Sequence, residues 1–385
     1  MANNSFYILW LPSWYPNKIK PFDGDFIQRH AKAAARYDDI HVIYLVKDDT
    51  GLKNVDEEII RHSRLTEQII YYKPDSKVAA KIVNVYNWLQ LYKKAIRKHI
   101  EKHGLPALVH VHVPWKAGIL ALWIKRKYKI PFLVTEHWGI YNDLINDNYR
   151  TKTYLFKLLT SRIIRSSALL LCVSNYSGLG INQLVVKKKF EIIVNTVDTD
   201  LFFLKEISPN FFRFIHISNA VPLKNLPGII SAATELYKKG YKFELVVVGS
   251  SEADFRKQFG EIFLSNQCIS FLGEVSYERV ALEMQQSNCL ILFSEIENSP
   301  CVIGEALCCG LPVISSSVGG IPELVTAENS LLVPSGDKAA LISAMKKVMQ
   351  TYPGYNRKKI AEAAAKKFGY NIIGKQINQA YSKVN

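Results

Sequence analysis

The chain has 385 residues, of which 48% are hydrophobic and 22% are charged, and its formal net charge is +15. Such a chain buries one large core or, more plausibly, two, and it lacks any apolar run long enough to cross a bilayer. Residues 1–200 carry 30 Lys/Arg and 18 Asp/Glu, whereas residues 201–385 carry 19 and 16. The basic first half suggests an anionic partner, such as a membrane surface, an acidic glycan or nucleic acid; a generally basic surface explains it equally well.

The cysteines and the first residues indicate a reducing compartment. All six cysteines follow residue 171, and none of them shows metal-ligand spacing. Cys308 and Cys309 are adjacent and cannot readily bridge each other, so we interpret them as small packing residues. The apolar stretch at residues 6–11 ends at Pro12, which is typical of a first strand and not of a signal peptide. We therefore expect a cytoplasmic protein, with peripheral contact at the inner face of the cell membrane as an option.

The first predicted strand leads into a long loop. Residues 6–11 are predicted to form a buried parallel strand, and an alanine-rich helix is expected over Ala31–Arg36. In an open α/β sheet the loop after the first strand faces the ligand crevice. Gly24 in that loop would let the backbone approach a phosphate or sugar closely, although a glycine that only makes a turn explains the position slightly better on its own.

A basic amphipathic helix is predicted further along the first half. Strands are expected at residues 41–47 and 69–73, followed by a helix over Tyr86–His103. Trp88 and Leu91 lie beside its polar face, which would suit an anionic membrane; a solvated helix face is the alternative. The polar face consists of Lys93, Lys94, Arg97, Lys98 and Lys102.

Histidines mark two strands that follow this helix. His110 and His112 alternate along the predicted strand at residues 108–113, and no third ligand is spaced for a metal. The apolar strand from Phe132 ends in Thr-Glu-His, which puts His137 at the carboxyl edge of the sheet. There it could hydrogen-bond a sugar hydroxyl, or it could be a core or capping histidine.

The strand–helix pattern restarts in the second half of the chain. A strand at residues 212–217 is followed by Asn219 and Lys224, and then by a helix. Further strands are expected at residues 243–249 and 268–274, and the second of these contains Gly273 near its end. No internal repeat, P-loop or zinc signature is present.

The most informative stretch combines two carboxylates with the start of a helix. Glu297 lies in a loop after an apolar strand, and a helix is predicted from Pro300 or Cys301 to Cys309. The backbone N–H groups where the loop meets this helix would form a seat for a phosphate. Glu305 falls in the second turn, so sugar hydroxyls at Glu297, a pyrophosphate at the amides and ribose hydroxyls at Glu305 fit one nucleotide sugar. A solvated loop carboxylate with a second one that complements the helix dipole is the plainer alternative.

This stretch resembles the signature of glycosyltransferase family 4, a group of retaining enzymes with the GT-B fold. The resemblance rests on Glu297, seven residues, Glu305, then Ala-Leu-Cys-Cys-Gly-Leu-Pro-Val-Ile and Gly-Gly-Ile-Pro-Glu-Leu-Val. It implies an α/β protein with two doubly wound Rossmann-like domains that face each other across a cleft. The domains implied are 1–195 on the acceptor side, 196–367 for the nucleotide sugar, and a terminal helix at 368–385 that crosses back.

The resemblance also implies roles for individual residues. Catalytic residues would be Glu297 and His137 at the donor sugar and Lys224 at the leaving diphosphate; no enzymatic nucleophile is assigned. Donor-binding residues would be Glu305, Asn219, Gly24, Ser299, Pro300, Cys301, Val302 and Gly273.

Two positions depart from the family pattern. Asn219 stands where an arginine is expected, and asparagine brings neither charge nor a bidentate fork to a phosphate. Thr196 replaces the usual glycine in the segment that links the domains, so we expect a turn of different shape there.

The function implied is transfer of a sugar from a UDP- or GDP-sugar to a glycan or lipid-linked acceptor, with retention of configuration, in bacterial surface polysaccharide synthesis. No cofactor and no metal are expected, and nucleic acid is not expected as a partner. The alternatives are a non-catalytic nucleotide-sugar or anionic-glycan binding protein, a GT-B sugar-nucleotide epimerase, and a glycoside hydrolase that uses the two carboxylates. Turnover that depends on both donor and acceptor separates the transferase from all three.

Overall fold

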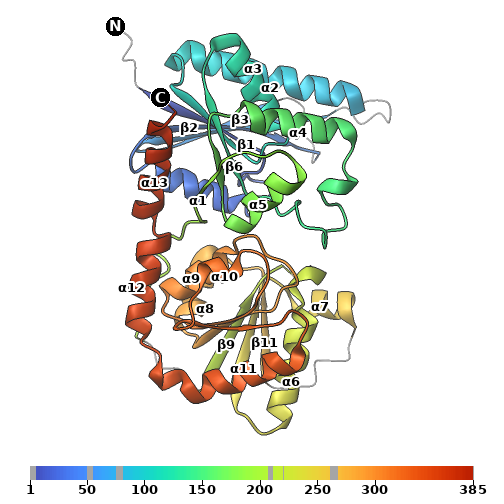
Figure 1. The fold of residues 1–385 in the computed structure, drawn as a ribbon, viewed down its shortest axis with the longest axis vertical. Coiled ribbons are helices and arrows are strands. Elements are labelled where there is room, and N and C mark those ends of the chain that lie inside the picture. The colour runs from blue at the N-terminus through green and yellow to red at the C-terminus, as the bar shows by residue number, and fades with distance from the viewer. Residues whose placement is uncertain are drawn as a thin grey trace. The chain divides into compact units, whose positions relative to one another are not determined.

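The computed structural model of the chain describes residues 6–49, 55–74, 81–206, 211–219, 221–260 and 268–384. These residues form two compact units, each built on its own sheet (Figure 1). The first unit consists of Met1–Val194 together with Tyr370–Asn385, and the second unit is Asn195–Gly369. The first unit is therefore made of two separate parts of the chain.

The first unit is built on an eight-stranded sheet with the order β3-β4-β2-β1-β5-β6-β7-β8. β3 pairs with β4 antiparallel, and the other neighbouring strands pair in parallel. β1, β5 and β6 are buried along their whole length, as expected where both faces of a sheet are covered. The strands are β1 (Tyr7–Pro12), β2 (Asp39–Lys47), β3 (Asp56–His62), β4 (Leu65–Tyr72), β5 (Leu108–His112), β6 (Phe132–Glu136), β7 (Leu170–Cys172) and β8 (Glu191–Ile192).

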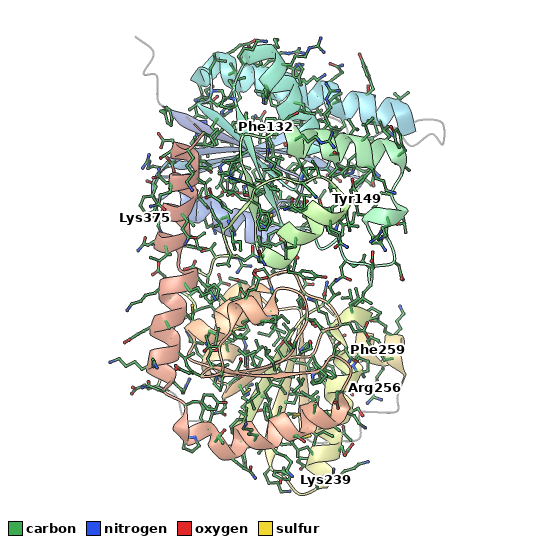
Figure 2. All side chains as sticks on the ribbon, viewed as in Figure 1. Phe132, Tyr149, Lys239, Arg256, Phe259 and Lys375 are labelled. Atoms are coloured by element: carbon green, nitrogen blue, oxygen red, sulfur yellow. The ribbon has the colours of Figure 1, made fainter. Side chains whose placement is uncertain are left out.

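Alternate residues of β1 enter two different cores, because successive side chains of a strand point to opposite faces. Tyr7 and Leu9 pack with α2–α5, whereas Ile8 and Trp10 pack with α1 and α13 (Figure 1). Figure 2 shows Phe132 inside this unit and Lys375 projecting outward from α13. The helices are α1 (Asp25–Ala34), α2 (Lys81–His103), α3 (Ala117–Tyr128), α4 (Tyr154–Ser166), α5 (Asn175–Leu184) and α13 (Tyr370–Ser382), with a 3-10 turn η2 (Tyr149–Thr151).

The second unit is built on a six-stranded sheet in which every pairing is parallel, with the order β11-β10-β9-β12-β13-β14. The strands are β9 (Phe212–Ile217), β10 (Phe243–Val248), β11 (Ile269–Gly273), β12 (Cys289–Leu292), β13 (Val313–Ser316) and β14 (Ser330–Val333). The helices are α6 (Leu226–Lys238), α7 (Glu252–Phe259), α8 (Tyr277–Gln285), α9 (Cys301–Cys308), α10 (Ile321–Leu324), α11 (Lys338–Thr351) and α12 (Arg357–Phe368), with 3-10 turns η3 (Pro222–Lys224) and η4 (Tyr352–Gly354).

Most predicted elements are present, and the differences lie in the first half. The helix expected to begin at Ala31 begins at Asp25, since Gly24 caps it. The strand expected at residues 69–73 begins at Leu65, and its antiparallel neighbour β3 was not predicted because its exposed edge lacks an apolar run. On α2, Trp88 and Leu91 are partly buried and pack against the core. Of the helices that the structure describes, none is long and apolar enough to span a membrane.

The helix α13 returns to the first unit and packs closely against α1. A Cβ atom on Gly374 would lie 2.1 Å from the carbonyl oxygen of Ala33, so the two backbones meet with no room for a side chain. Polar contacts add to this packing: Trp10 Nε1 donates to the hydroxyl of Tyr381 at 3.0 Å. In the second unit, the N–H of Val197 donates to the carbonyl of Phe368 at 2.8 Å. The chain therefore enters and leaves this unit at adjacent positions.

Replacing Gly374 with alanine should destabilise the protein, because the new methyl group meets backbone and not a flexible side chain. We expect a loss of about 1–3 kcal/mol, larger than the gain in helix propensity. Urea unfolding followed by circular dichroism measures the change. Gly354→Ala is the matched control, since a Cβ there meets nothing within 4 Å. Equal stability of the two variants would contradict the close α1–α13 contact.

Candidate active site

The carboxyl ends of the parallel strands bring the candidate residues of the second unit to one edge of its sheet. The strands β9, β11 and β12 end at Ile217, Gly273 and Leu292, and a loop follows each of them. Since all these strands run in the same direction, the loops share one edge, which is where open α/β sheets bind ligands. Gly273 is the last residue of β11 and lies on this edge.

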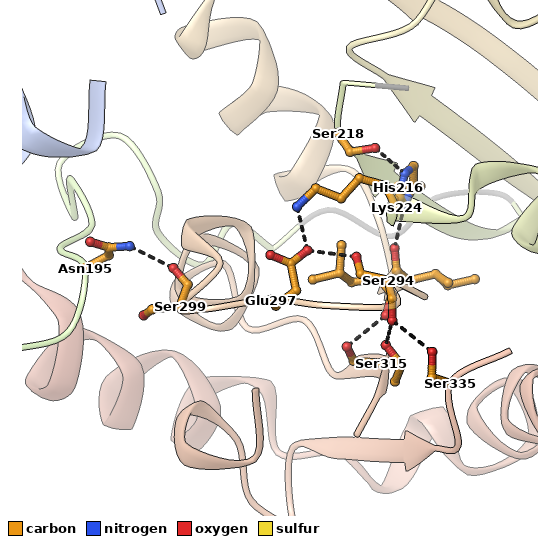
Figure 3. A network of polar contacts seen from close by, with 12 residues as sticks. Asn195, His216, Ser218, Lys224, Ser294, Glu297, Ser299, Ser315 and Ser335 are labelled. Carbon is orange, nitrogen blue, oxygen red and sulfur yellow. Dashed lines mark hydrogen bonds and ion pairs between the residues drawn. The ribbon is translucent and has the colours of Figure 1, made fainter. Parts of the chain in front are cut away.

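A buried carboxylate lies at the centre of this edge. Glu297, in the loop between β12 and α9, is 8% exposed, and its Oε1 accepts from Lys224 Nζ at 2.6 Å and from Ser294 Oγ at 2.7 Å (Figure 3). Lys224 comes from the short turn η3 that follows β9, and its side chain is 25% exposed. The structure therefore brings together two residues that the sequence predicted separately.

The shape of the β12–α9 loop depends on a glycine pair. Gly319 has φ of +54°, and a Cβ on it would lie 1.7 Å from the carbonyl oxygen of Glu297. The N–H of Gly320 donates to that same oxygen at 3.2 Å. On the other side of the loop, Asn195 Nδ2 donates to the carbonyl of Ser299 at 2.7 Å (Figure 3). The loop is thus held at both ends through its backbone carbonyls.

The helix α9 begins at Cys301 after Pro300 and has no side-chain cap at its N-terminus. Its first backbone N–H groups have no intrahelical partner, so they suit a phosphate. Cys301 and Val302 are partly exposed there, and Ser299 is buried. Glu305, in the second turn, is 2% exposed and accepts a hydrogen bond from the hydroxyl of Tyr277.

The residues after β9 are arranged by a buried histidine. His216 Nδ1 lies 2.9 Å from the carbonyl oxygen of Ile291, and Nε2 lies 2.7 Å from Ser218 Oγ (Figure 3). Burial, assisted by the charge of Lys224, lowers the pKa of His216 to about 4. A neutral ring that faces a carbonyl must carry its proton on Nδ1, so Ser218 donates to Nε2. Asn219 follows and is exposed to solvent.

In the first unit, His137 follows β6 and lies in a buried group of aromatic rings. His137 is 8% exposed, and its Nε2 is 3.0 Å from Nδ1 of His112, at the end of the neighbouring strand β5. The His112 and His137 rings are stacked with centroids 5.3 Å apart. Burial, followed by the charges of neighbouring histidines, holds the pKa of His112 well below its usual value, so this ring is neutral.

The loop that carries His137 is anchored by Glu136. Its carboxylate accepts from the N–H of Trp138 at 2.8 Å and from the hydroxyl of Tyr141 at 2.5 Å. Burial raises the pKa of Glu136 to about 7. Gly24, also in the first unit, caps α1 with φ of +68°, and a Cβ on it would lie 2.5 Å from the backbone of Trp14. A close contact within the loop thus accounts for this glycine.

Sequence reasoning missed Ser294 and Tyr277, whose hydroxyl groups donate to the candidate carboxylates Glu297 and Glu305. Ser294 follows the apolar run at residues 289–293. A polar residue at the end of such a run could have been predicted to face the site. Tyr277 carried no such signal, because it lies 28 residues from Glu305 in a separate helix. Among the residues described, no group of three or more His, Cys, Asp or Glu side chains could hold a metal ion.

Comparison with solved structures extends to nearly the whole chain. Sucrose-phosphate synthase from Thermosynechococcus elongatus matches with a TM-score of 0.77 at 17% identity, covering 98% of this chain and 99% of that one. HepE of Anabaena, in complex with UDP, matches with a TM-score of 0.73 at 18% identity, covering 98% and 100%. The class of protein is therefore defined by its architecture: two Rossmann-like α/β units of the GT-B fold, as predicted.

Family models and sequence relatives give the same assignment. The model described as Glycosyltransferase Family 4 matches residues 27–201, and the model described as Glycosyl transferases group 1 matches residues 198–367. An uncharacterised glycosyltransferase of Methanocaldococcus jannaschii is 28% identical over 295 residues, covering 74% of this chain and 76% of the relative. A Bacillus subtilis protein, TuaC, named as a candidate teichuronic acid biosynthesis glycosyltransferase, is 23% identical over 364 residues, or 88% of each chain. The chain belongs to the family 4 glycosyltransferases and is a transferase of class EC 2.4.

Removing the cation beside Glu297 should expose the cost of burying this carboxylate. We expect Lys224→Met to lower the free energy of unfolding by about 1–3 kcal/mol, because a buried charge loses its principal partner. Adding Glu297→Gln should restore much of the loss, since the amide oxygen still accepts from Ser294. Urea unfolding of wild type, both single variants and the double variant measures the coupling. Additive effects of the two substitutions would show that the pair does not interact.

Proposed function

We propose that the protein transfers a sugar from a UDP- or GDP-sugar to a glycan or lipid-linked acceptor, with retention of the anomeric configuration. One observation carries this proposal: the paired Lys224 and Glu297 lie at the carboxyl edge of the second sheet, next to the start of α9. A cation, a carboxylate and the backbone amides at a helix start match the diphosphate and the sugar hydroxyls of a nucleotide sugar.

The leaving diphosphate would be stabilised by charge and by backbone donors. Lys224 supplies the cation, and the N–H groups of Ser299, Cys301 and Val302 supply hydrogen bonds that need no rearrangement during the reaction. Glu297 would bind donor-sugar hydroxyls, since carboxylate oxygens accept from hydroxyl groups. The 2.6 Å distance from Lys224 Nζ to Glu297 Oε1 keeps the phosphate ligand and the sugar ligand together before any donor arrives.

The nucleoside would be held by the other end of α9. Glu305 accepts hydrogen bonds and would bind ribose hydroxyls, with Gly273 near the base. Asn219 is exposed and brings one amide donor where the family has an arginine, so the phosphates would depend mainly on Lys224 and the amides. HepE of Anabaena is solved with UDP and with UDP-glucose, which supports a uridine nucleotide as one donor candidate.

The first unit would contribute to the sugar and the acceptor. We assign His137 to a hydrogen bond with a donor-sugar hydroxyl, with His112 as its neighbour on β5. For the acceptor, two relatives have names that refer to bacterial polysaccharides: TuaC, and AmsK of Erwinia amylovora, an amylovoran biosynthesis glycosyltransferase. These names support an acceptor from surface polysaccharide synthesis. We propose that the reaction occurs in the cytoplasm, at the membrane.

One helix of the first unit has a face suited to an anionic membrane. On α4, Tyr154, Leu155 and Leu158 are 80%, 61% and 49% exposed. Viewed along the helix axis, these three side chains and the exposed Arg162 and Arg165 all fall within one sector of about 100°. Helices that bind the surface of an anionic membrane combine exposed apolar side chains with cations in this way. The neighbouring helix α3 adds Lys125, Arg126 and Lys127, so positive charge continues across the surface.

Donor binding is tested by thermal shift against UDP- and GDP-sugars. One nucleotide sugar should raise the melting temperature of the wild type by mass action, and Glu305→Ala should lose that response. Glu235→Ala, which removes an exposed carboxylate on α6, is the control that keeps it. Release of nucleoside diphosphate that requires an acceptor then separates a transferase from a binding protein, and NMR of the product anomer tests retention. If no nucleotide sugar stabilises the wild type, the proposal is wrong.

The membrane face is tested by sedimentation with lipid vesicles. Wild type should pellet with vesicles that contain phosphatidylglycerol and not with phosphatidylcholine alone, with weaker binding at high salt. The double substitution Leu155→Ser and Leu158→Ser should reduce the bound fraction by about tenfold, as two apolar anchors are lost. Leu332→Ser, at an exposed leucine in the second unit, serves as the control. Equal binding of all three proteins would rule out α4 as the anchor.

A further inference from the structure

Tyr277 is tied to Glu305 although the two residues come from different helices. Tyr277 is the first residue of α8, and its hydroxyl donates to Oε1 of Glu305 in the second turn of α9. Glu305 is almost completely buried, whereas Tyr277 is partly exposed. A tyrosine hydroxyl is a neutral donor, so it orients a carboxylate without neutralising its charge.

The ring of Tyr277 is itself held in place. It contacts Phe202 edge-to-face, with centroids 5.0 Å apart and planes at 72°. Phe202 is fully buried, and its N–H donates to the carbonyl of Asp198 at 2.8 Å. The neighbouring carbonyl of Leu201 accepts from Gln285, the last residue of α8, at 3.1 Å. Both ends of α8 therefore contact the segment that carries Phe202.

This arrangement restricts a side chain that would otherwise rotate. Glutamate has three rotatable side-chain bonds, and a carboxylate that accepts from both hydroxyls of a vicinal diol must turn its two oxygens toward them. Tyrosine has two such bonds, and here its ring is already packed. Fixing Glu305 before the ligand binds lowers the entropy lost on binding.

We propose that Tyr277 is a positioning residue of the nucleotide site, which orients the Glu305 carboxylate toward a ribose that carries both hydroxyls. The site then selects ribonucleotides over 2′-deoxyribonucleotides. This inference rests on the proposed role of Glu305 in binding ribose. It adds that Tyr277 makes the Glu305 carboxylate selective. It also names the property of the ligand that is recognised, the 2′-hydroxyl, which can be removed without any other change.

The experiment compares ligands that differ only at the 2′ position. Titration calorimetry with UDP, 2′-deoxy-UDP, GDP and 2′-deoxy-GDP gives the ribose preference of each protein as a ratio of dissociation constants. Wild type should prefer at least one ribonucleotide by about tenfold or more, because the deoxy form leaves a buried acceptor without its hydroxyl. Tyr277→Phe should reduce that ratio by about threefold or more, through weaker binding of the ribonucleotide with the deoxynucleotide unchanged.

Two further variants separate the possible failures. Glu305→Gln should lose most of the preference, and Tyr237→Phe should behave as wild type, because it removes a hydroxyl from α6 in the same unit. If Glu305→Gln loses the preference while Tyr277→Phe keeps it, the inference about Tyr277 is wrong and the ribose role of Glu305 stands. If Glu305→Gln binds all four nucleotides as wild type does, or if wild type binds none, both are wrong. Circular dichroism and melting temperature confirm that each variant is folded.

Discussion

The arrangement of the second unit depends on a carboxylate that is buried at the edge of its sheet. Burial of an unpaired charge is costly, so Glu297 needs nearby donors, and it obtains them from Lys224 and Ser294. Lys224 can reach it because β9 and β12 are neighbours in the sheet. The loop of Glu297 keeps its shape because Gly319 allows a backbone approach that no other residue permits. Through its side chain and its backbone carbonyl, Glu297 thus links three loops of the second unit.

The two units use their polar side chains differently. The second unit concentrates charge, with paired ions at the strand ends and the start of a helix beside them. The first unit buries neutral rings, since His112 and His110 are both held well below their usual pKa by burial. His110 lies 2.8 Å from the hydroxyl of Tyr381 on α13, so even the last helix contributes to this group. A charged region suits a phosphate, and a group of neutral donors and acceptors suits sugar hydroxyls.

The fold class and the family were predictable because both follow from local patterns. Alternating strands and helices predicted the two α/β units, and the nine residues from Glu297 to Glu305 with their neighbours indicated the family; both are confirmed. The residue roles stay predictions. The contact of Tyr277 with Glu305 was beyond sequence reasoning, because it depends on how α8 and α9 pack. The edge strand β3 was missed because of its own composition. Its charged residues suit an exposed edge, and they do not form the apolar pattern from which strands are predicted.

The return of the chain to its first unit has a consequence for biosynthesis. Synthesis proceeds from the N-terminus, so the strands of the first unit leave the ribosome long before Tyr370–Ser382 does. Until then, the face of the sheet that receives Ile373 and Ile377 lacks its covering helix, and the backbone of α1 at Ala33 has no partner at Gly374. The whole second unit is made in that interval. A ribosome that stalls before residue 370 would thus release a chain with an apolar face for chaperones to bind.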